Sequence, residues 1–548
     1  MASNDPGLAT VAAPAEDPLK GAVVNTSSNT SERPASSAEE TVATEEVIAP
    51  DQFDERYTTT RNETWAYYSY YIGNNGLSLF NFAPTAAQNL LYQHAEAIGG
   101  PDNTIVNFAG ADRTINGIIL LCNGISFAIQ AVLFLIIGAY ADFGTFRPNI
   151  LIGLSLVAWG IGFGWLGVHE EPLWQHGLGL YIVGLIAYQL CLTYWTAAFP
   201  GLARNTPEMR AMAEKFEDGA CSRDEYNHAD SMKRNELSNV AFYVQSVAEL
   251  VILAVIVGVM FGLNVNDSVE ANNYGLSVLI AFASGVWILV ALPWFWLEKR
   301  RPGQDPGMNI VVAGLWQLRN AMTQVWQLRQ SLFYLIGYFL LGDSLNTTVT
   351  VIGTLQSEIV AYNTLQLTYL LIVGIAAQAV GIWSFWNVQK RYQLSTKTMF
   401  NVVAVGIIVL DGWGMIGNWT DKFGFHQAWE LWVYQAFYGL FVCPWYTYSQ
   451  TMISEVTPRG KEFLFFSLFS IIGKTSSFIG PFVTSAIIVD ADNNNSAAFY
   501  FLFALSLVSF LFMLFFVDVK QSRVEQAEFL ERERIAKLKL RGDSEESI

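Results

Sequence analysis

The chain has few of the residues with which most enzymes carry out chemistry. Its 548 residues include four cysteines and five histidines, and only 14% are Asp, Glu, Lys or Arg. It contains no CxxC pair, no phosphate-binding glycine loop followed by Lys-Ser/Thr, and no GxSxG turn. These absences argue against a disulfide or metal framework, an ATP-driven pump and a hydrolase. They predict a protein that is not an enzyme and uses no cofactor or metal. The cysteines are predicted to be packing residues: Cys122, Cys191, Cys221 and Cys443.

Long apolar stretches take the place of catalytic motifs, and 52% of the residues are hydrophobic. A helix crosses a hydrocarbon core of about 30 Å with about 20 apolar residues, at about 1.5 Å per residue. Twelve stretches between Trp65 and Val517 have this character. They lie near 65–92, 115–140, 149–168, 177–199, 239–263, 275–297, 331–353, 364–388, 399–417, 427–449, 462–489 and 497–517. The chain is therefore predicted to be an all-α integral membrane protein that spans the bilayer twelve times.

The connections between the stretches predict the orientation, because loops rich in Lys and Arg stay on the cytoplasmic side. With both termini cytosolic, the inside loops hold seventeen Lys and Arg residues, and the outside loops hold only Arg113 and Lys422. Residues 1–64 carry twelve acidic and four basic residues and so contribute −8 of the net charge of −17. This segment has few large apolar residues and is predicted to be a disordered cytosolic tail. No basic stripe suggests binding to nucleic acid.

The spacing of the stretches divides the chain into two halves of six spans, which is typical of duplicated transporters. The predicted organisation is a tail (1–64), a first half (65–297) with a cytosolic loop (200–238), a linker (298–330), a second half (331–518) and a cytosolic C-terminal tail (519–548). In such proteins the substrate binds near the bilayer midplane, between the halves, where helices are often interrupted.

Two polar clusters inside the first and seventh spans are candidates for this site. The first cluster is Gly73–Ser78, and the second is Gly342–Thr348. Glycine can loosen a helix, and freed backbone groups are tolerated at membrane depth only where they line a cavity. The alternative is close helix packing through small residues. The candidate ligands for a zwitterionic solute are Asn74, Asn75, Ser78, Asp343 and Asn346, with Asp343 placed to hold an ammonium group.

Four ionisable side chains lie within the spans: Glu249, Asp343, Asp411 and Lys474. A charge at the centre of a spanning helix costs about 2.5–3.5 kcal/mol on insertion scales, so each should face a cavity or a partner. Asp343 and Lys474 could pair across the second half. Glu249 or Asp343 is a candidate proton site, while structural ion pairs are the alternative, above all for Lys474 and Asp411.

The connection after the second span reads Gly138-Ala-Tyr-Ala-Asp142-Phe-Gly144-Thr-Phe-Arg147. It resembles the Gly-x-x-x-Asp-x-Gly-x-x-Arg signature of the major facilitator superfamily. This resemblance implies a bundle of twelve helices in two six-helix halves. It also implies that Asp142 and Arg147 form a cytoplasmic gate, which stabilises the state closed to the cytosol.

A second resemblance covers residues 60–520 and is sharpest at the tenth and eleventh spans. There the chain reads Ser454-Glu455-Val-Thr-Pro458-Arg-Gly460-Lys-Glu462 and, further on, Gly473-Lys474-Thr-Ser-Ser-Phe-Ile-Gly480-Pro481. Together with the start of span one and the Phe199–Arg204 segment, these residues resemble the fungal autophagy-related protein 22 family. The resemblance implies a vacuolar membrane protein that returns amino acids from autophagic degradation to the cytosol and sustains protein synthesis in nitrogen starvation.

One departure and three sequons qualify this interpretation. Family members often carry a Ser-Glu-Pro-like segment where this chain has Gly73-Asn74-Asn75-Gly76, which points to a divergent paralogue. The resemblance places Asn266, Asn418 and Asn494 in lumenal loops as glycosylation sites.

The predicted function is amino-acid export from the vacuole by alternating access. Two alternatives stay open: proton-coupled transport of another small solute, and a receptor or scaffold that does not transport.

Overall fold

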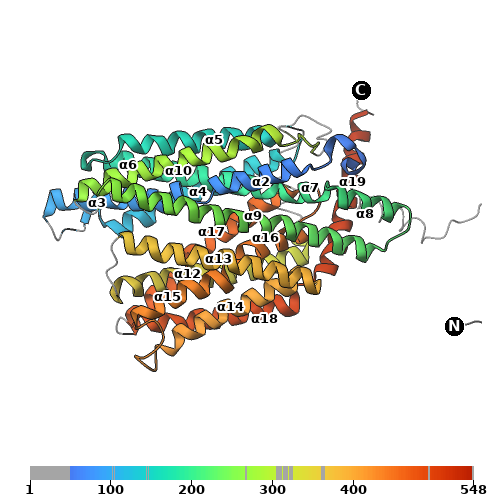
Figure 1. The fold of residues 1–548 in the computed structure, drawn as a ribbon. Coiled ribbons are helices and arrows are strands. Elements are labelled where there is room, and N and C mark those ends of the chain that lie inside the picture. The colour runs from blue at the N-terminus through green and yellow to red at the C-terminus, as the bar shows by residue number, and fades with distance from the viewer. Residues whose placement is uncertain are drawn as a thin grey trace, which may run out of the picture. The chain divides into compact units, whose positions relative to one another are not determined.

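Helices dominate the part of the chain that the structure describes. The structure is a computed structural model that describes residues 50–545, with gaps at 101–102, 104, 144, 146, 266–267, 304–311, 313–318, 320–324, 360–363 and 492–493. Most of its helices run side by side (Figure 1). The predicted tail of residues 1–64 falls largely outside this range, although its last residues are structured.

The first half contains α2 (Arg61–Gly73), the π-helical turn η3 (Leu77–Phe82), α3 (Ala83–Gly99), α4 (Ile115–Ala141), α5 (Arg147–Gly164), α6 (Trp174–Ala197), α7 (Phe199–Arg204), α8 (Pro207–Glu217), α9 (Arg223–Gly262) and α10 (Val269–Leu297). The second half contains α12 (Arg329–Ile359), α13 (Thr364–Tyr392), α14 (Thr396–Ile416), α15 (Ala428–Phe437), the π-helical turn η7 (Tyr438–Val442), α16 (Pro444–Val456), α17 (Glu462–Asp490) and α18 (Ala498–Phe516). A final helix, α19, covers Val519–Glu545.

Short elements complete the described chain. The 3-10 turns are η1 (Pro50–Phe53), η2 (Glu55–Tyr57), η4 (Trp165–Gly167), η5 (Glu171–Leu173), η6 (Val325–Gln327) and η8 (Asn495–Ala497). The hairpin of β1 (Ile105–Phe108) and β2 (Ala111–Thr114) joins α3 to α4, with Ile105 opposite Thr114. The apolar-length argument did not predict this hairpin.

Each of the twelve predicted spans coincides with a helix or, for the first and tenth, with two helices joined by a π-helical turn. By length and composition, nine helices among the described residues could each cross a membrane. Large apolar side chains such as Leu289, Trp296 and Phe515 are 71–79% exposed. Patches of this kind are stable against lipid and costly in water. The protein is a multi-pass membrane protein.

Side-chain caps set where several helices begin. Ser222 accepts a hydrogen bond from the backbone N–H of Glu225, whose carboxylate accepts one from the backbone N–H of Ser222. This capping box starts α9 well before the apolar stretch, so the helix extends 40 residues and projects past the predicted span. The predicted polar loop 200–238 is therefore mostly helical, formed by α7, α8 and the first turns of α9.

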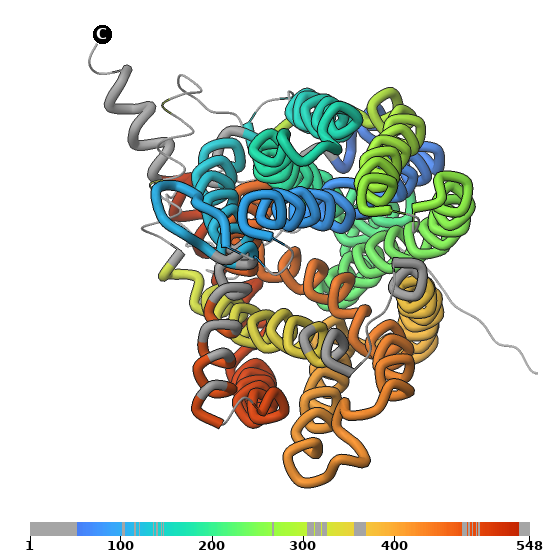
Figure 2. The backbone as a smooth tube through the Cα atoms, turned by 90° about the vertical axis from the view of Figure 1, so that its left-hand side faces the viewer, coloured from blue at the N-terminus to red at the C-terminus, as the bar shows by residue number. Residues whose placement is uncertain are grey.

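The two halves pack against each other along the helices. α9 packs on α13, and α4 packs on α17. Seen along the helices, the first half (blue to green) and the second half (yellow to red) form two groups, as Figure 2 shows. Buried aromatic side chains fill the first half, among them Trp165, Trp195, Trp287 and Trp294. Of the cysteines, Cys122, Cys191 and Cys443 are buried, and all four are free.

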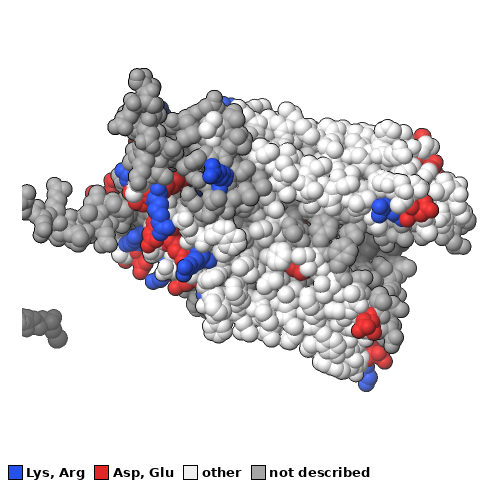
Figure 3. Space-filling model, turned by 180° about the vertical axis from the view of Figure 1, so that it is seen from behind, with Lys and Arg blue, Asp and Glu red and all other residues white. Residues whose placement is uncertain are grey.

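Charged side chains gather at one end of this bundle, which we call the charged end. It carries α8, α19 and the ion pairs of Arg204, Asp230 and Glu455. On the face drawn in Figure 3, Lys and Arg cluster at this end and the middle is almost free of charge. The distribution matches a bilayer-spanning bundle, whose apolar middle faces lipid.

Candidate functional site between the two halves

The polar cluster of the first span interrupts its helix, as the sequence predicted. α2 ends at Gly73, Gly76 adopts a left-handed φ of 95°, and η3 begins at Leu77. The Asn75 side chain stabilises the turn, because its Oδ1 accepts a hydrogen bond of 2.9 Å from the backbone N–H of Leu77. Asn74 is fully buried, and neither of its amide atoms has a hydrogen-bond partner. Such a group is rare in a native core, so it marks this break as a place where a polar solute could bind.

Two members of the same cluster serve helix packing. Ser78 donates a hydrogen bond to the carbonyl of Ile280 at 3.1 Å and lies 2.7 Å from the Ser284 hydroxyl. A Cβ on Gly73 would come within 2.6 Å of the Trp287 Cα, so only glycine lets α2 approach α10 this closely. The packing alternative therefore accounts for Gly73 and Ser78, while Asn74 and Asn75 stay candidates for binding.

The prediction that span seven is also irregular is wrong. α12 runs without interruption through Gly342–Thr348. Asp343, which is 3% exposed, accepts a hydrogen bond of 2.9 Å from the backbone N–H of Gly480 on α17. Asp411 on α14 accepts hydrogen bonds from Thr348 at 2.5 Å and from Ser344 at 3.2 Å. These polar residues join helices within the second half, which is why the helix needs no break to satisfy them.

The other candidates of the second half are less well defined. Asn346 is half-buried on α12, where its carbonyl accepts a hydrogen bond from Thr350. Lys474 lies on α17, but its side chain is outside the part of the chain that the structure describes. The pairing of Asp343 with Lys474 therefore stays a prediction.

The second interrupted helix is the tenth span, where η7 separates α15 from α16. The backbone of α13 lies directly against this turn: a Cβ on Gly439 would come within 2.4 Å of the Gly374 carbonyl oxygen, and one on Gly381 within 2.4 Å of the Leu440 oxygen. In the sequence, Gly439 and Pro444 were the features that could have predicted this interruption, since proline cannot donate the backbone hydrogen bond of a regular helix. The interrupted helices are spans one and ten, which belong to opposite halves.

Glu249 lies between these two interruptions. It is 5% exposed in the middle of α9, and the Gln245 amide donates a hydrogen bond to its carboxylate. It interacts electrostatically with Tyr71 of α2, Tyr188 of α6 and Cys443 beside η7. The sequence singled out Glu249 and missed its neighbours, because tyrosine within an apolar stretch gives no distinctive signal.

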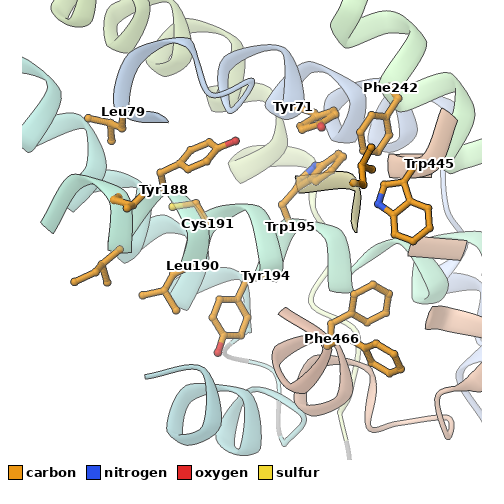
Figure 4. Packing of buried hydrophobic residues seen from close by; sticks show 14 of the residues in the cluster. Tyr71, Leu79, Tyr188, Leu190, Cys191, Tyr194, Trp195, Phe242, Trp445 and Phe466 are labelled. Carbon is orange, nitrogen blue, oxygen red and sulfur yellow. The ribbon is translucent and has the colours of Figure 1, made fainter. Parts of the chain in front are cut away.

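Aromatic side chains surround this position. Tyr71 stacks on Trp195 with ring centroids 4.3 Å apart, and Phe242 meets Tyr71 edge-on at 4.8 Å. Figure 4 shows these three side chains close to Trp445 of the second half. Gln378 of α13 donates a hydrogen bond of 2.8 Å to the Ser246 hydroxyl and so links the halves next to Glu249. We call Tyr71, Tyr188, Trp195, Glu249 and Tyr446 the central cluster.

At the charged end the two halves are tied together. Asp142 accepts hydrogen bonds of 3.1 Å from the backbone N–H groups of Phe463 and Leu464, at the start of α17. These two backbone donors, at the partly positive N-terminus of the helix, offset part of the cost of burying the Asp142 carboxylate. The Arg147 guanidinium lies 5.3 Å from the centre of the Phe463 ring and donates to the Arg301 carbonyl at 3.0 Å.

Further contacts across the halves strengthen this closure. Arg204 forms an ion pair of 3.0 Å with Glu462, and Arg459 lies 3.8 Å from Asp230. Arg234, which pairs with Asp230, also donates to the Ser454 carbonyl at 2.8 Å. Within the described residues, the ion pairs that join the halves lie at this end. The structure is therefore a conformation closed at the charged end.

The Asp142 carboxyl makes this closure sensitive to pH. Burial and the negative charge of Glu462 raise the pKa of Asp142 to about 8, from an ordinary value of 3.8. The closed conformation consequently holds a proton more tightly than one in which Asp142 meets water. Low pH therefore favours the closed conformation. As the pH rises from about 4 to about 8, the equilibrium constant for closure falls by up to about tenfold per pH unit.

We expect this effect in the reactivity of a cysteine placed at Ser467, which is fully buried beside Gly138 in the closed conformation. In a background without the native cysteines, alkylation should speed up between pH 6 and pH 8 after correction for thiol ionisation. Asp142→Asn should remove most of the dependence. An unchanged slope in that variant would mean that another group titrates.

Two of the predicted glycosylation sites, Asn418 and Asn494, lie at the end opposite the charged end. Asn494 is exposed, whereas Asn418 is half-buried and its side-chain nitrogen donates to the carbonyls of Met415 and Ser496. Asn266 lies outside the described residues. Asn494 is the sterically better acceptor of the two described sites, and its occupancy stays a prediction.

Comparisons with known proteins identify the relatives of this chain. The family model described as "Vacuole effluxer Atg22 like" matches residues 59–527. Autophagy-related protein 22 of Saccharomyces cerevisiae is 26% identical over 288 residues, which cover 48% of this chain and 54% of that protein. The chain thus spans about half the length of this relative. The protein of the same name from Chaetomium globosum is 26% identical over 77% of this chain and 72% of its own length.

Solved structures show the same fold. The proton:xylose symporter XylE, of the major facilitator superfamily, superposes with a TM-score of 0.56 at 14% identity over 86% of this chain and 99% of its own. The transporter FucP of that superfamily, in the outward conformation, superposes with a TM-score of 0.52 at 14% identity, over 83% of this chain and 97% of its own. The predicted all-α fold of the major facilitator type is confirmed.

Proposed function

The chain belongs to the family of Atg22-like vacuole effluxers, and we propose on this premise that it carries amino acids out of the vacuole by alternating access. The released amino acids would sustain protein synthesis during nitrogen starvation. The vacuole is suggested by the description of the family, and the fold is that of transporters that expose one central site to each side in turn. The proposed cargo is the zwitterionic solute for which a polar, partly charged central site is suited.

The observation that carries this proposal is the set of polar contacts that closes the two halves at the charged end. Asp142, Arg204 and Arg234 of the first half each contact α16 or α17 of the second half at the charged end. Buried hydrogen bonds and ion pairs of this kind are discrete contacts that form or break together. Breaking them would open the central cluster to that side, which is the movement that alternating access requires.

We assign the charged end to the cytosol. Most Lys and Arg residues of the loops lie there, and such loops are retained on the cytoplasmic side. The segment before α2 and the helix α19 both meet this end, where Arg301 donates to the Tyr57 carbonyl and Lys520 pairs with Asp224. Both termini would then be cytosolic, with Asp142 and Arg147 as the cytoplasmic gate. Asn418 and Asn494 would face the lumen.

Amino-acid retention in vacuoles tests this function. Vacuoles isolated from nitrogen-starved cells that lack the protein should retain severalfold more amino acids than those from cells that express it. A variant without residues 1–49 serves as the matched control, because a carrier should export normally without this tail and a tail-based scaffold should not. Equal retention with and without the protein would contradict vacuolar efflux.

A further inference from the structure

Glu249 is a buried acid that forms no ion pair within the part of the chain that the structure describes. The residue lies in the membrane-spanning part of α9, where an ionised side chain without a partner is costly. Its described partner is the neutral Gln245 amide, and none of the Lys and Arg side chains in the described part of the chain pairs with it. Asp343 and Asp411, by contrast, are satisfied by hydrogen bonds from neighbouring helices. The carboxylate of Glu249 thus differs from the other buried acids of the spans.

The surroundings of Glu249 suit a ligand that carries a positive charge. Tyr71 of α2 and Tyr188 of α6 lie near Glu249, and Tyr446 of α16 lies near both tyrosines. Aromatic faces attract cations that lie within about 6 Å of the ring centre, and the attraction is stronger where water is excluded. Tyr446 is 41% exposed, and its hydroxyl lies 3.2 Å from that of Tyr438.

Both halves contribute to this arrangement, which is the placement expected of a transported ligand. Tyr71 stacks on Trp195 and lies two residues before Gly73, where α2 ends. Cys443 directly follows η7, the interruption of the tenth span. The two interrupted helices therefore converge on the same carboxylate. A ligand bound there would sense any movement of one half against the other.

We infer that Glu249, with Tyr71 and Tyr188, binds the ammonium group of the transported solute, so that the substrates are zwitterionic or cationic primary amines. This inference rests on the proposed transport function and names its substrate class. The role that the sequence gave to Asp343 moves to Glu249, because Asp343 is already engaged by the Gly480 backbone. Neutral sugars lack the charge that this site requires.

A binding measurement on the purified protein tests the inference without requiring transport. The probes are lysine, leucine, leucine amide and N-acetyl-leucine, and the readout is the rise in melting temperature of the wild-type protein with ligand concentration. The first three carry an ammonium group and should stabilise the protein. N-acetyl-leucine should do so at least tenfold more weakly by apparent affinity. Equal stabilisation by N-acetyl-leucine would overturn the inference even if no variant could be made.

Glu249→Gln then assigns the interaction to this side chain, with the exposed Glu270→Gln as the matched control. Glu249→Gln should weaken binding of the amines at least tenfold, and Glu270→Gln should leave it unchanged. If Glu249→Gln binds and exchanges amino acids like the wild type but no longer responds to a pH gradient, Glu249 carries a proton and the inference is wrong. If amines bind through Glu249 but the protein transports none of them, the proposed transport function is refuted and the inferred ammonium-binding site is supported.

Discussion

Replacing Arg301 with Gln is expected to lower the free energy of unfolding by about 3–5 kcal/mol, the cost of stranding a buried charge. Glu63 is fully buried, and the Arg301 guanidinium binds it in a fork, at 2.8 Å to Oε1 and 2.9 Å to Oε2. The same guanidinium donates to the Thr59 hydroxyl and to the Tyr57 carbonyl. This ion pair connects the start of the first span with the segment that follows the sixth span. Its loss should therefore destabilise the first half.

The neighbouring Arg300 provides the matched control for this prediction. It is exposed and donates a single hydrogen bond of 3.0 Å to Asn149, so Arg300→Gln should change stability by less than about 1 kcal/mol. The double change of Arg301 and Glu63 to Leu should recover much of the lost stability. Thermal unfolding followed by size-exclusion chromatography measures all three variants. Equal melting temperatures for Arg301→Gln and Arg300→Gln would show that the buried pair does not stabilise the fold.

Replacing Gly439 with Val is expected to separate α13 from the interrupted tenth span and to abolish transport. A Cβ at this position would lie 2.4 Å from the Gly374 carbonyl oxygen and 2.7 Å from the Ala377 Cβ. The obstacle is largely backbone, which cannot rotate away as a side chain could. We therefore expect a cost of about 3 kcal/mol, at the upper end of the usual range for overpacking.

Gly258→Val on α9 is the control, because nothing lies within 4 Å of a Cβ there and the position is exposed. Its expression, monodispersity and uptake should match the wild type, whereas Gly439→Val should show low yield or a folded protein without uptake. Normal uptake by Gly439→Val would mean that the close approach of α13 to η7 is not needed for function.

Much of the fold follows from the sequence because the bilayer dictates the length and composition of each span. The positions of all twelve spans were predictable in this way. The β1–β2 hairpin and the extension of α9 to Arg223 were not, because they depend on loop packing and on the Ser222 cap. Likewise, the contacts of the predicted C-terminal tail were not predictable: within α19, Phe529 and Glu533 are buried, and Glu533 pairs with Lys461 at 2.7 Å.

The site was less predictable than the fold because spanning helices are apolar on all sides. Composition locates Glu249, Asp343 and Asp411 along the chain, but it does not determine which helix each one faces. In the structure, Asp343 and Asp411 accept hydrogen bonds from neighbouring helices, whereas Glu249 lies near Tyr71 and Tyr188. The break in span one was visible through its glycines and asparagines. The break in span ten was missed because Gly439 and Pro444 lie in a strongly apolar context.

Counterflow of labelled amino acids tests the central claim of transport most directly. Liposomes that contain the purified protein and unlabelled neutral or basic amino acids should accumulate the labelled form from outside, and Asn75→Leu should abolish this uptake because it removes the side chain that holds the Leu77 turn. Protein-free liposomes define the background. Uptake that depends on Asn75 would establish a carrier of amino acids. Failure of the monodisperse wild-type protein to exchange any amino acid would contradict the account.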